Sequence, residues 1–286
     1  HDSIHPERVI VGAETPEDFA TMRRIYQRFV DSSTVQYLEM NPYEAATVKL
    51  LSNAALFARL AFTFSTVGRI CEAIPNLNYE NVRRGIIGDS RIGRWGFYDS
   101  LFAGGSCLIK DAESLSWQLE THGARADFMR GVLAANRDQI MHFLSRAKTE
   151  AGFSFEGKSV ALLGLAFKQD TNDMRHSGAI HVLEHVLESG ATSVRAWDPA
   201  AMDVCRTLFP KDKGRNSVIG YTESAEEAIK GADCVIIATD WPQFRTLGDT
   251  ILEHAARPCL VMDGRRMIES QYRQLAASGM SVIAVG

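Results

Sequence analysis

The sequence lacks long uncharged apolar runs, and it has few cysteines. No stretch of about 18 uncharged apolar residues occurs, so we expect no membrane-spanning segment. The five cysteines are scattered, odd in number and free of Cys-x-x-Cys spacing, which favours buried thiols over a disulfide or zinc framework. The N-terminus has neither a basic stretch nor an apolar core, so it does not read as a signal peptide. We therefore expect a cytoplasmic protein.

Clusters of positive charge are also missing. The formal net charge of the 286 residues is −4 and no run of lysine or arginine occurs, so we expect neither a nucleic-acid partner nor a charged membrane surface as partner. With 45% hydrophobic and 23% charged residues, the composition excludes disordered and fibrous classes. The length suggests about two domains.

The first part of the chain carries helix-start signals and one long helical pattern. A short buried strand at residues 7–12 is followed by starts at Thr15-Pro16 and Asn41-Pro42, where a capping side chain precedes a proline suited to the first turn. From there to about residue 74 the apolar rhythm is helical, interrupted only by Gly68. Such a helix is on the order of 45 Å long, and helices of that length usually bury two faces.

The middle of the chain combines a short helix, a glycine-rich stretch and two further helices. A helix from Asn78 is expected to end at Gly85, and residues 86–110 lack periodicity, which indicates a long structured loop of the kind that usually has a function. Helices are then expected from Asp111 to about Glu120 and from about Ala124 to Lys148.

After Gly152 the pattern changes to short β-type runs, most of them separated by helical segments. The first run, 159–167, is followed by an amphipathic helix at 177–189 and by runs at 193–197, 218–221, 233–238, 259–262 and 281–285. This alternation predicts an α/β fold with a doubly wound parallel sheet, whose ligand crevice lies at the carboxyl ends of the strands. The expected layout is a helical half followed by this α/β half.

One cysteine stands in a setting suited to chemistry. Cys107 follows two glycines, precedes an expected helix and lies near Lys110 and Asp111. A thiol at a helix N-terminus beside a lysine has the surroundings of a nucleophile. The alternative is a small residue in a tight turn, with Asp111 as a helix cap.

Two polar residues interrupt the apolar long helix. Lys49 and Asn53 are four residues apart and therefore share a face, from which they could donate to a developing oxyanion. On spacing alone, a solvated stripe of the helix is the favoured interpretation.

Phosphate and metal signals in the α/β half are weak. Gly164 to Lys168 follow the first strand, where a nucleotide-binding fold holds a phosphate, but the chain contains no Gly-x-Gly-x-x-Gly fingerprint. His181 and His185 are spaced for a metal, yet no third ligand accompanies them, so we expect no metal site and a packed or solvated helix face.

Several segments together resemble the UDP-glucose/GDP-mannose dehydrogenase family of nucleotide-sugar dehydrogenases. The glycine-framed cysteine followed by Lys-Asp is the specific match, and the other segments are short. They occur in the family's order at residues 49–54, 89–93, 104–111, 164–175, 197–199, 239–241 and 263–265.

This resemblance implies a three-part architecture of which the chain contains the last two parts. Residues 1–12 would be a remnant of the N-terminal NAD-binding domain. Residues 13–150 would form the central helical domain, with homodimerisation through the long helix at about 42–74. Residues 151–286 would form the Rossmann-like domain that binds the UDP-sugar. The segment with the family's catalytic glutamate would be absent.

The resemblance also implies a reaction and roles for residues. A nucleotide-sugar C6 alcohol, that of UDP-glucose first of all, would be oxidised to the carboxylate with two NAD⁺. Cys107 would capture the aldehyde as a thiohemiacetal and then form a thioester, Lys49 and Asn53 would stabilise the oxyanion, and Asp111 would order the hydrolytic water or take its proton. The NAD contacts would be Lys110 and Arg175, and the substrate contacts would be Arg91 (across the dimer), Tyr98, Phe102, Gly104, Phe167, Lys168 and Arg265.

The sequence departs from the family pattern at four positions around these motifs. Ala103 and Leu108 flank the cysteine core, Gly96 stands where phenylalanine is frequent, and His176 stands where glutamate commonly follows the arginine. These differences affect the choice of sugar, so a UDP-N-acetylhexosamine or GDP-mannose remains an alternative substrate. A second alternative is a dimerising, nucleotide-sugar-binding module that has no redox activity by itself.

Overall fold

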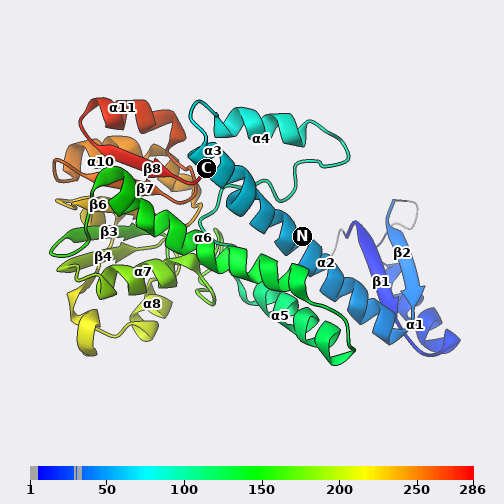
Figure 1. The fold of residues 1–286 in the computed structure, drawn as a ribbon. Coiled ribbons are helices and arrows are strands. Elements are labelled where there is room, and N and C mark those ends of the chain that lie inside the picture. Colours follow the sequence, from blue (N-terminus) through cyan, green and yellow to red (C-terminus); the bar gives the residue numbers. More distant parts are fainter. Residues whose placement is uncertain (1–5, 29, 31–33) are drawn as a thin grey trace. The chain divides into compact units, whose positions relative to one another are not determined.

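A computed structural model describes residues 6–28, 30 and 34–286 (Figure 1). The chain forms two compact units, residues 1–55 and 56–286, and their boundary falls within helix α2 (Pro42–Phe62). The five N-terminal residues, on which part of the signal-peptide expectation rests, lie outside the described residues.

The first unit contains a β-α-β arrangement. Strand β1 (Arg8–Gly12) and strand β2 (Gln36–Met40) pair in parallel, and helix α1 (Pro16–Tyr26) connects them. The capping signals are confirmed, because the Thr15 hydroxyl accepts from the backbone N–H of Asp18 at 3.2 Å. At the start of α2, Asn41 and Glu44 bond reciprocally to each other's backbone N–H. Strand β2 is absent from the sequence expectations.

The long helical run is confirmed and contains an unexpected π-helical segment. Helix α2 continues through η1 (Thr63–Gly68), which is π-helical, into α3 (Arg69–Ala73). An 18-residue window of Pro42–Ala73 has a mean hydropathy of 1.3 and no more than two charged residues, so the run is apolar enough to cross a membrane by composition. This differs from the expectation, which counted only uncharged stretches. A third of the window is buried inside the molecule, and core helices of globular proteins have the same composition.

Three further helices precede the sheet. Helix α4 (Tyr79–Ile87) is capped by Asn78 and extends past Gly85, α5 spans Ser106–Thr121, and α6 spans Asp127–Ala151. The expectation that the helix after the cysteine begins at Asp111 is wrong, because α5 begins at Ser106. Gly105 makes this earlier start feasible: its φ of +90° turns the chain into the helix without a side-chain cap. Cys107 therefore lies inside the first helical turn.

The second unit is completed by the doubly wound parallel sheet that the sequence predicts. Its strand order is β5-β4-β3-β6-β7-β8, and all neighbours are parallel. The strands are β3 (Ser159–Leu163), β4 (Ser193–Trp197), β5 (Ile219–Tyr221), β6 (Cys234–Ile237), β7 (Leu260–Asp263) and β8 (Ser281–Ala284). The order reverses between β3 and β6, and ligands bind at such a point beyond the carboxyl ends of the strands.

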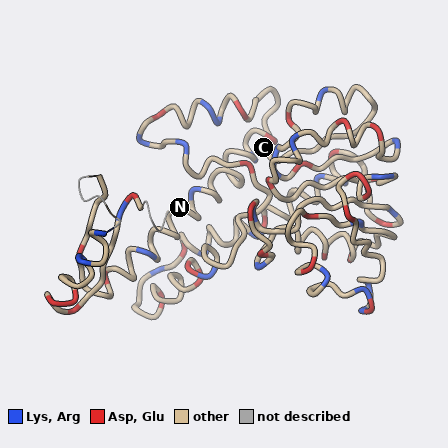
Figure 2. The backbone as a smooth tube through the Cα atoms, turned by 180° about the vertical axis from the view of Figure 1, so that it is seen from behind, with Lys and Arg blue, Asp and Glu red and all other residues tan. Residues whose placement is uncertain are grey.

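Helices cover both faces of this sheet (Figure 1). Helix α7 (Gly178–Glu188) contacts β3 and β4, and α6 contacts β7 and β8. The opposite face packs against α9 (Ala225–Ile229), α10 (Leu247–His254) and α11 (Tyr272–Ala277) around Phe244 and Ile251. The remaining helical segments are α8 (Met202–Leu208) and the 3₁₀ turns η2 (Gly214–Val218), η3 (Pro242–Thr246) and η4 (Glu269–Gln271). Positively and negatively charged residues are interspersed along the described chain (Figure 2).

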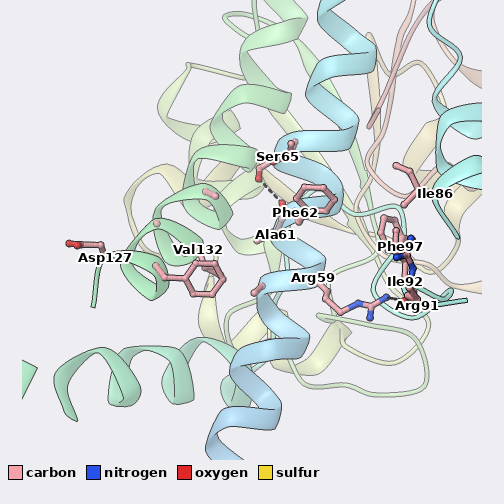
Figure 3. A pocket seen from close by; sticks show the side chains of 15 residues that line it. Arg59, Ala61, Phe62, Ser65, Ile86, Arg91, Ile92, Phe97, Asp127 and Val132 are labelled. Carbon is pink, nitrogen blue, oxygen red and sulfur yellow. Dashed lines mark hydrogen bonds between the residues drawn. The ribbon is translucent and has the colours of Figure 1, made fainter. Parts of the chain in front are cut away.

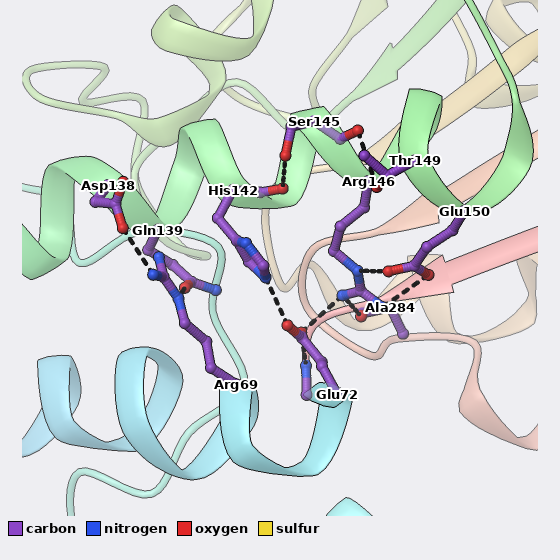
Figure 4. A network of polar contacts seen from close by, with 11 residues as sticks. Arg69, Glu72, Asp138, Gln139, His142, Ser145, Arg146, Thr149, Glu150 and Ala284 are labelled. Atoms are coloured by element: carbon purple, nitrogen blue, oxygen red, sulfur yellow. Dashed lines mark hydrogen bonds and ion pairs between the residues drawn. The ribbon is translucent and has the colours of Figure 1, made fainter. Parts of the chain in front are cut away.

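One largely buried carboxylate joins the helical part of the second unit to the end of the sheet (Figure 4). Glu72, on α3, hydrogen-bonds to His142 Nε2 at 2.7 Å and accepts from Arg146 Nη1 at 2.7 Å, both on α6. It also accepts from the backbone N–H of Gly286 at 3.0 Å. Arg146 in turn donates to the carbonyl of Ala284 on β8 at 2.6 Å. Helices α3 and α6 and strand β8 are thus held by one network.

Candidate active site

Cys107 is the one exposed cysteine of the five, all of which lie in the described part of the chain. It occupies the second position of α5, where backbone N–H groups lack helical partners and the helix dipole is positive. Burial keeps the other four thiols from solvent, and it raises the pKa of Cys205 and Cys259 to about 12. Only Cys107 is therefore placed to act as a nucleophile.

The two glycines before the cysteine are required by the chain that packs on them. A Cβ on Gly104 would lie 2.4 Å from the carbonyl oxygen of His176, and one on Gly105 would lie 2.9 Å from the ring of Phe167. The N–H of Gly105 donates to that same His176 carbonyl at 3.4 Å. His176 itself has a φ of +52°, in the region that favours glycine. The loop after β3 is thus packed against the cysteine loop.

Charged groups lie close to the thiol. Asp111 is 2% exposed and forms an ion pair with the exposed Lys110 at 2.6 Å. This hydrogen bond and the carboxylate charge raise the pKa of Lys110, and the charge of Cys107 adds to the increase. The pKa of Arg175 is raised by its hydrogen bonds to Asp173 and, in smaller part, by Cys107. Lys110 and Arg175 are therefore both close enough to Cys107 to interact with it electrostatically.

The segment before the glycines is anchored to the carboxyl edge of the sheet. Arg265, just after β7, donates from Nη1 to the hydroxyl of Ser100 at 2.6 Å and forms an ion pair with Asp240 at 2.7 Å. The Ser100 hydroxyl donates in turn to the carbonyl of Phe102 at 2.7 Å. The neighbouring residue Ala103 is bonded through both backbone groups to the side chain of Asn136 on α6.

A second carboxylate organises the edge of the sheet. Asp198 follows β4 and is 1% exposed. One of its oxygens accepts from the N–H groups of Leu165 and Ala166, at 2.6 and 3.1 Å, and from the indole of Trp241 at 3.0 Å. The other oxygen accepts from the N–H groups of Ala200 and Ala201, both at 2.8 Å. Asp198 thereby fixes the turn that leads into Phe167 and Lys168.

The structure brings most of the sequence-predicted residues of the second unit together. Seven of them are connected to one another by packing contacts, by electrostatic interactions or through the hydroxyl of Ser100. They are Gly104, Cys107, Lys110, Asp111, Phe167, Arg175 and Arg265. Lys168 is exposed, with Nζ 5.6 Å from the centre of the Phe167 ring. Tyr98 is half exposed and packs edge-on against Trp95. Phe102 is buried, and its ring packs edge-on against His181.

Arg91 lies in a different place. Its side chain is 88% exposed and pairs with Asp89 at 2.7 Å. It lines a groove of about 840 Å³ between the long helix, α4 and α6, shown in Figure 3. The groove is mainly apolar, and its lining includes Phe62, Phe97 and Phe128. The side chain of Arg59 holds the loop that contains Arg91, because it donates to the carbonyl of Ile92 at 2.5 Å.

Lys49 and Asn53 lie four residues apart on α2, in the first unit. Cys107 and Asp111 belong to the second unit. Their association in one site stays a prediction. The expectation about His181 and His185 concerns α7, where His181 contacts the ring of Phe102 and His185 that of Phe155. Among the described residues, no group of three or more metal-ligating side chains is found.

Comparison with known proteins gives two family matches along the chain. Residues 43–138 match the central domain of the UDP-glucose/GDP-mannose dehydrogenase family, and residues 161–270 match the UDP-binding domain of the same family. The chain belongs to the UDP-glucose/GDP-mannose dehydrogenase family. The cysteine loop lies in the first of these domains, and the edge of the sheet that anchors it lies in the second.

Relatives of this family member cover nearly all of the chain. It is 31% identical over 93% of its length to the UDP-glucose 6-dehydrogenase AglM of Haloferax volcanii, and 32% identical over 93% to the UDP-glucose 6-dehydrogenase of Pseudomonas aeruginosa. A UDP-glucose dehydrogenase structure from Pyrobaculum islandicum superposes with a TM-score of 0.83 over 99% of the chain, at 27% identity, covering 60% of that structure. The chain spans 59% and 58% of the two curated relatives.

Sequence reasoning did not single out several residues that build this site. Ser100 and Asn136 act on backbone groups from distant positions and carry no local signal. Asp198 and Asp240 lie within segments 197–199 and 239–241, which the family resemblance includes, but their roles are visible only in the hydrogen bonds.

Proposed function

We propose that this chain is the central and UDP-sugar-binding part of an NAD-dependent nucleotide-sugar 6-dehydrogenase, with UDP-glucose as substrate. The observation that carries the proposal is the exposed thiol of Cys107 on the first turn of α5, with its loop packed against the carboxyl edge of a parallel sheet. The UDP-glucose 6-dehydrogenases among its relatives support the substrate. A cytoplasmic location is consistent with a biosynthetic role.

Cys107 acts as the nucleophile in this proposal. Oxidation of a primary alcohol to a carboxylate releases two hydrides and consumes one water. After the first oxidation, the thiolate adds to the aldehyde carbon and forms a thiohemiacetal, which keeps the reactive aldehyde on the protein. Loss of the second hydride leaves a thioester, and water then releases the carboxylate and restores the thiol.

Three polar residues assist these steps. Lys49 and Asn53, on one face of α2, stabilise the negative charge that develops on the oxygen of the reacting substrate carbon. Asp111 orders the hydrolytic water or takes its proton. Its carboxylate is almost fully buried and held by Lys110, so its direction is fixed.

The remaining site residues bind the two ligands. Phe167, Lys168 and Arg265 hold sugar and phosphate at the point where the strand order reverses, and the 98–104 segment, with Tyr98, Phe102 and Gly104, lines the nucleotide-sugar. NAD⁺, when bound, accepts the hydrides. The exposed cations Lys110 and Arg175 beside Cys107 suit its phosphates, and they would approach the cofactor from this chain.

We further propose that two copies associate through the long helix, and that Arg91 completes the partner's site. The groove beside Arg91 is apolar and leaves Phe128 71% exposed, which fits a second copy of the same surface. In the proposed domain division, residues 13–150 are the central domain and 151–286 the UDP-sugar domain. Residues 1–12 are the proposed remnant of the NAD-binding domain, and their strand β1 pairs with β2.

The experiment that tests the function replaces the nucleophile in the full-length protein. Cys107→Ser is expected to lower uronate formation from UDP-glucose and NAD⁺ by at least about a thousandfold, because a hydroxyl is a far weaker nucleophile at neutral pH. Binding of UDP-glucose, measured by calorimetry, should persist. Cys71→Ala, at a buried cysteine, is the control and should retain turnover.

Undiminished uronate formation by Cys107→Ser would refute the role of this thiol. The alternative module without redox activity is tested with residues 1–286 alone. That alternative predicts binding of the nucleotide-sugar without reduction of NAD⁺. GDP-mannose and a UDP-N-acetylhexosamine, titrated in parallel, decide between the substrates.

A further inference from the structure

One helix side chain, distant in sequence, holds the backbone that leads to Cys107. Asn136, on α6, is 1% exposed, and its amide makes two hydrogen bonds to a single residue. The backbone N–H of Ala103 donates to Asn136 Oδ1 at 2.8 Å, and Asn136 Nδ2 donates to the carbonyl of Ala103 at 3.1 Å. A carboxamide satisfies both groups at once because it carries a donor and an acceptor in one plane.

This pair of bonds is the last strong anchor before the cysteine. Ala103 is followed by Gly104 and Gly105, which have no side chains with which to hold the loop. The next bond, from Gly105 to the carbonyl of His176, is longer at 3.4 Å, and α5 begins without a side-chain cap. The start of α5, and with it Cys107, therefore depends on where Ala103 is held.

We propose that Asn136 is a positioning residue for Cys107. The proposal rests on the proposed role of this thiol as the nucleophile. Asn136 sets the entry of the chain into α5 and so keeps the sulfur beside Arg175, on the loop that packs against Gly104 and Gly105. Without the amide, both backbone groups of Ala103 lose their partners in the interior, and the loop must shift to satisfy them.

The first measurement is steady-state kinetics of the full-length protein. Asn136→Ala is expected to lower kcat by about ten- to a hundredfold, because a nucleophile displaced by about 1 Å loses that much rate. KM for the nucleotide-sugar should change by a smaller factor than kcat, since Asn136 bonds only to the backbone of Ala103 and to none of the proposed binding side chains. A general loss of structure would change both constants.

The second measurement does not depend on catalysis. Cys107 in the ligand-free protein is alkylated with iodoacetamide, and the modified peptide is quantified by mass spectrometry. Asn136→Ala should slow this reaction by at least about threefold at neutral pH, because the sulfur loses its fixed position beside the guanidinium of Arg175. Gln139→Ala is the matched control: Gln139 lies on the same helix, is equally buried and bonds to Arg69 instead of the cysteine loop.

A third variant replaces only the NH₂ group of the side-chain amide by an oxygen. In Asn136→Asp an ionised carboxylate still accepts from the N–H of Ala103 but repels its carbonyl oxygen. A protonated carboxyl supplies the missing donor. The alkylation rate of this variant relative to the unchanged protein, at the same pH, should therefore rise as the pH is lowered from 8 to about 5.

These outcomes separate the two proposals. If Asn136→Ala reacts and turns over like the unchanged protein, or loses no more than Gln139→Ala, the positioning role is wrong. A flat ratio for Asn136→Asp across this pH range also counts against it. If instead Cys107→Ser still forms uronate, the proposed function fails. The alkylation results would still show whether Asn136 positions Cys107.

Discussion

Single side chains decide how the loop before Cys107 meets the sheet. Arg265 is the clearest case, because one guanidinium reaches Ser100 in the loop and Asp240 after β6. Burial alone would raise the pKa of Asp240. The positive charge and hydrogen bond of Arg265 outweigh this, so its pKa lies below the usual value. The ion pair therefore contributes to stability through the ionised carboxylate.

The sign of this effect predicts an acid dependence. A carboxylate with a lowered pKa stabilises the fold above its unfolded value of about 3.9 and loses that contribution as the pH falls through the folded value. Asp240→Asn should cost about 1 kcal/mol at pH 7, since the Asp240 side chain is 39% exposed, and this difference should shrink below about pH 4. Urea unfolding between pH 3 and 7 measures it.

An exposed carboxylate provides the comparison. Asp203 is 96% exposed and pairs with Arg206 on the surface. Asp203→Asn should change the free energy of unfolding by less than about 0.5 kcal/mol at every pH. A cost of Asp240→Asn that stayed constant down to pH 3 would show that the ion pair is not its source.

Helix starts are predictable at the element scale where a side chain caps them. Thr15, Asn41 and Asn78 are recognisable caps, and each accepts the expected backbone N–H. The start of α5 has no such signal, because Gly105 turns the chain by its positive φ and no side chain caps the helix. The sequence pattern therefore favours a start at Asp111, a residue that resembles a cap.

The loop from 88 to 105 can be recognised from its glycines, but its attachments cannot. Thr63, in the π-helical segment, donates to the carbonyl of Gly96 at 2.9 Å. Gly96 has a φ of +87°, and a Cβ there would lie 2.8 Å from Cβ of Arg59. The positive φ and this contact explain why glycine occupies the position.

Comparing Gly93 with Gly96 distinguishes the effect of a positive φ from the effect of the contact with Arg59. Gly93 has a φ of +67°, and a Cβ there would meet no described atom within 4 Å beyond its chain neighbours, whereas Gly96 combines positive φ with the contact to Arg59. Gly93→Ala should destabilise by about 1 kcal/mol from backbone strain alone. Gly96→Ala should cost about 2–3 kcal/mol, because Arg59 must also move. Urea unfolding of both variants measures the difference, and equal costs would refute the steric explanation.

At the scale of the whole molecule, the alternation of strands and helices is sufficient to predict the doubly wound sheet. The contacts that complete the site are not predictable in this way. Arg265 and Ser100 are 165 residues apart, and Asn136 and Ala103 are 33 apart. No local pattern connects them, since each pairing depends on the three-dimensional packing of finished elements.

Association of two copies is the prediction that belongs to this scale. Phe128 is exposed at the apolar groove beside Arg91, so Phe128→Glu places a charge in the proposed interface. Its dimer dissociation constant, measured by sedimentation equilibrium of the full-length protein, should rise at least about tenfold. Leu208→Glu, at a comparably apolar exposed site on α8, should leave it unchanged. Equal dissociation constants for both variants would place the interface elsewhere.

The network around Glu72 has a consequence for the order in which the chain folds during synthesis. Glu72 and the backbone N–H of Gly286 are 214 residues apart, and His142 and Arg146 lie between them. Because translation proceeds from the N-terminus, α3 and α6 emerge from the ribosome long before this last partner. Their carboxylate and guanidinium can pair early, but the network closes only after residue 286 has been made. The hydrogen bonds that fix α3 and α6 to the sheet are therefore complete only after its last strand has been synthesised.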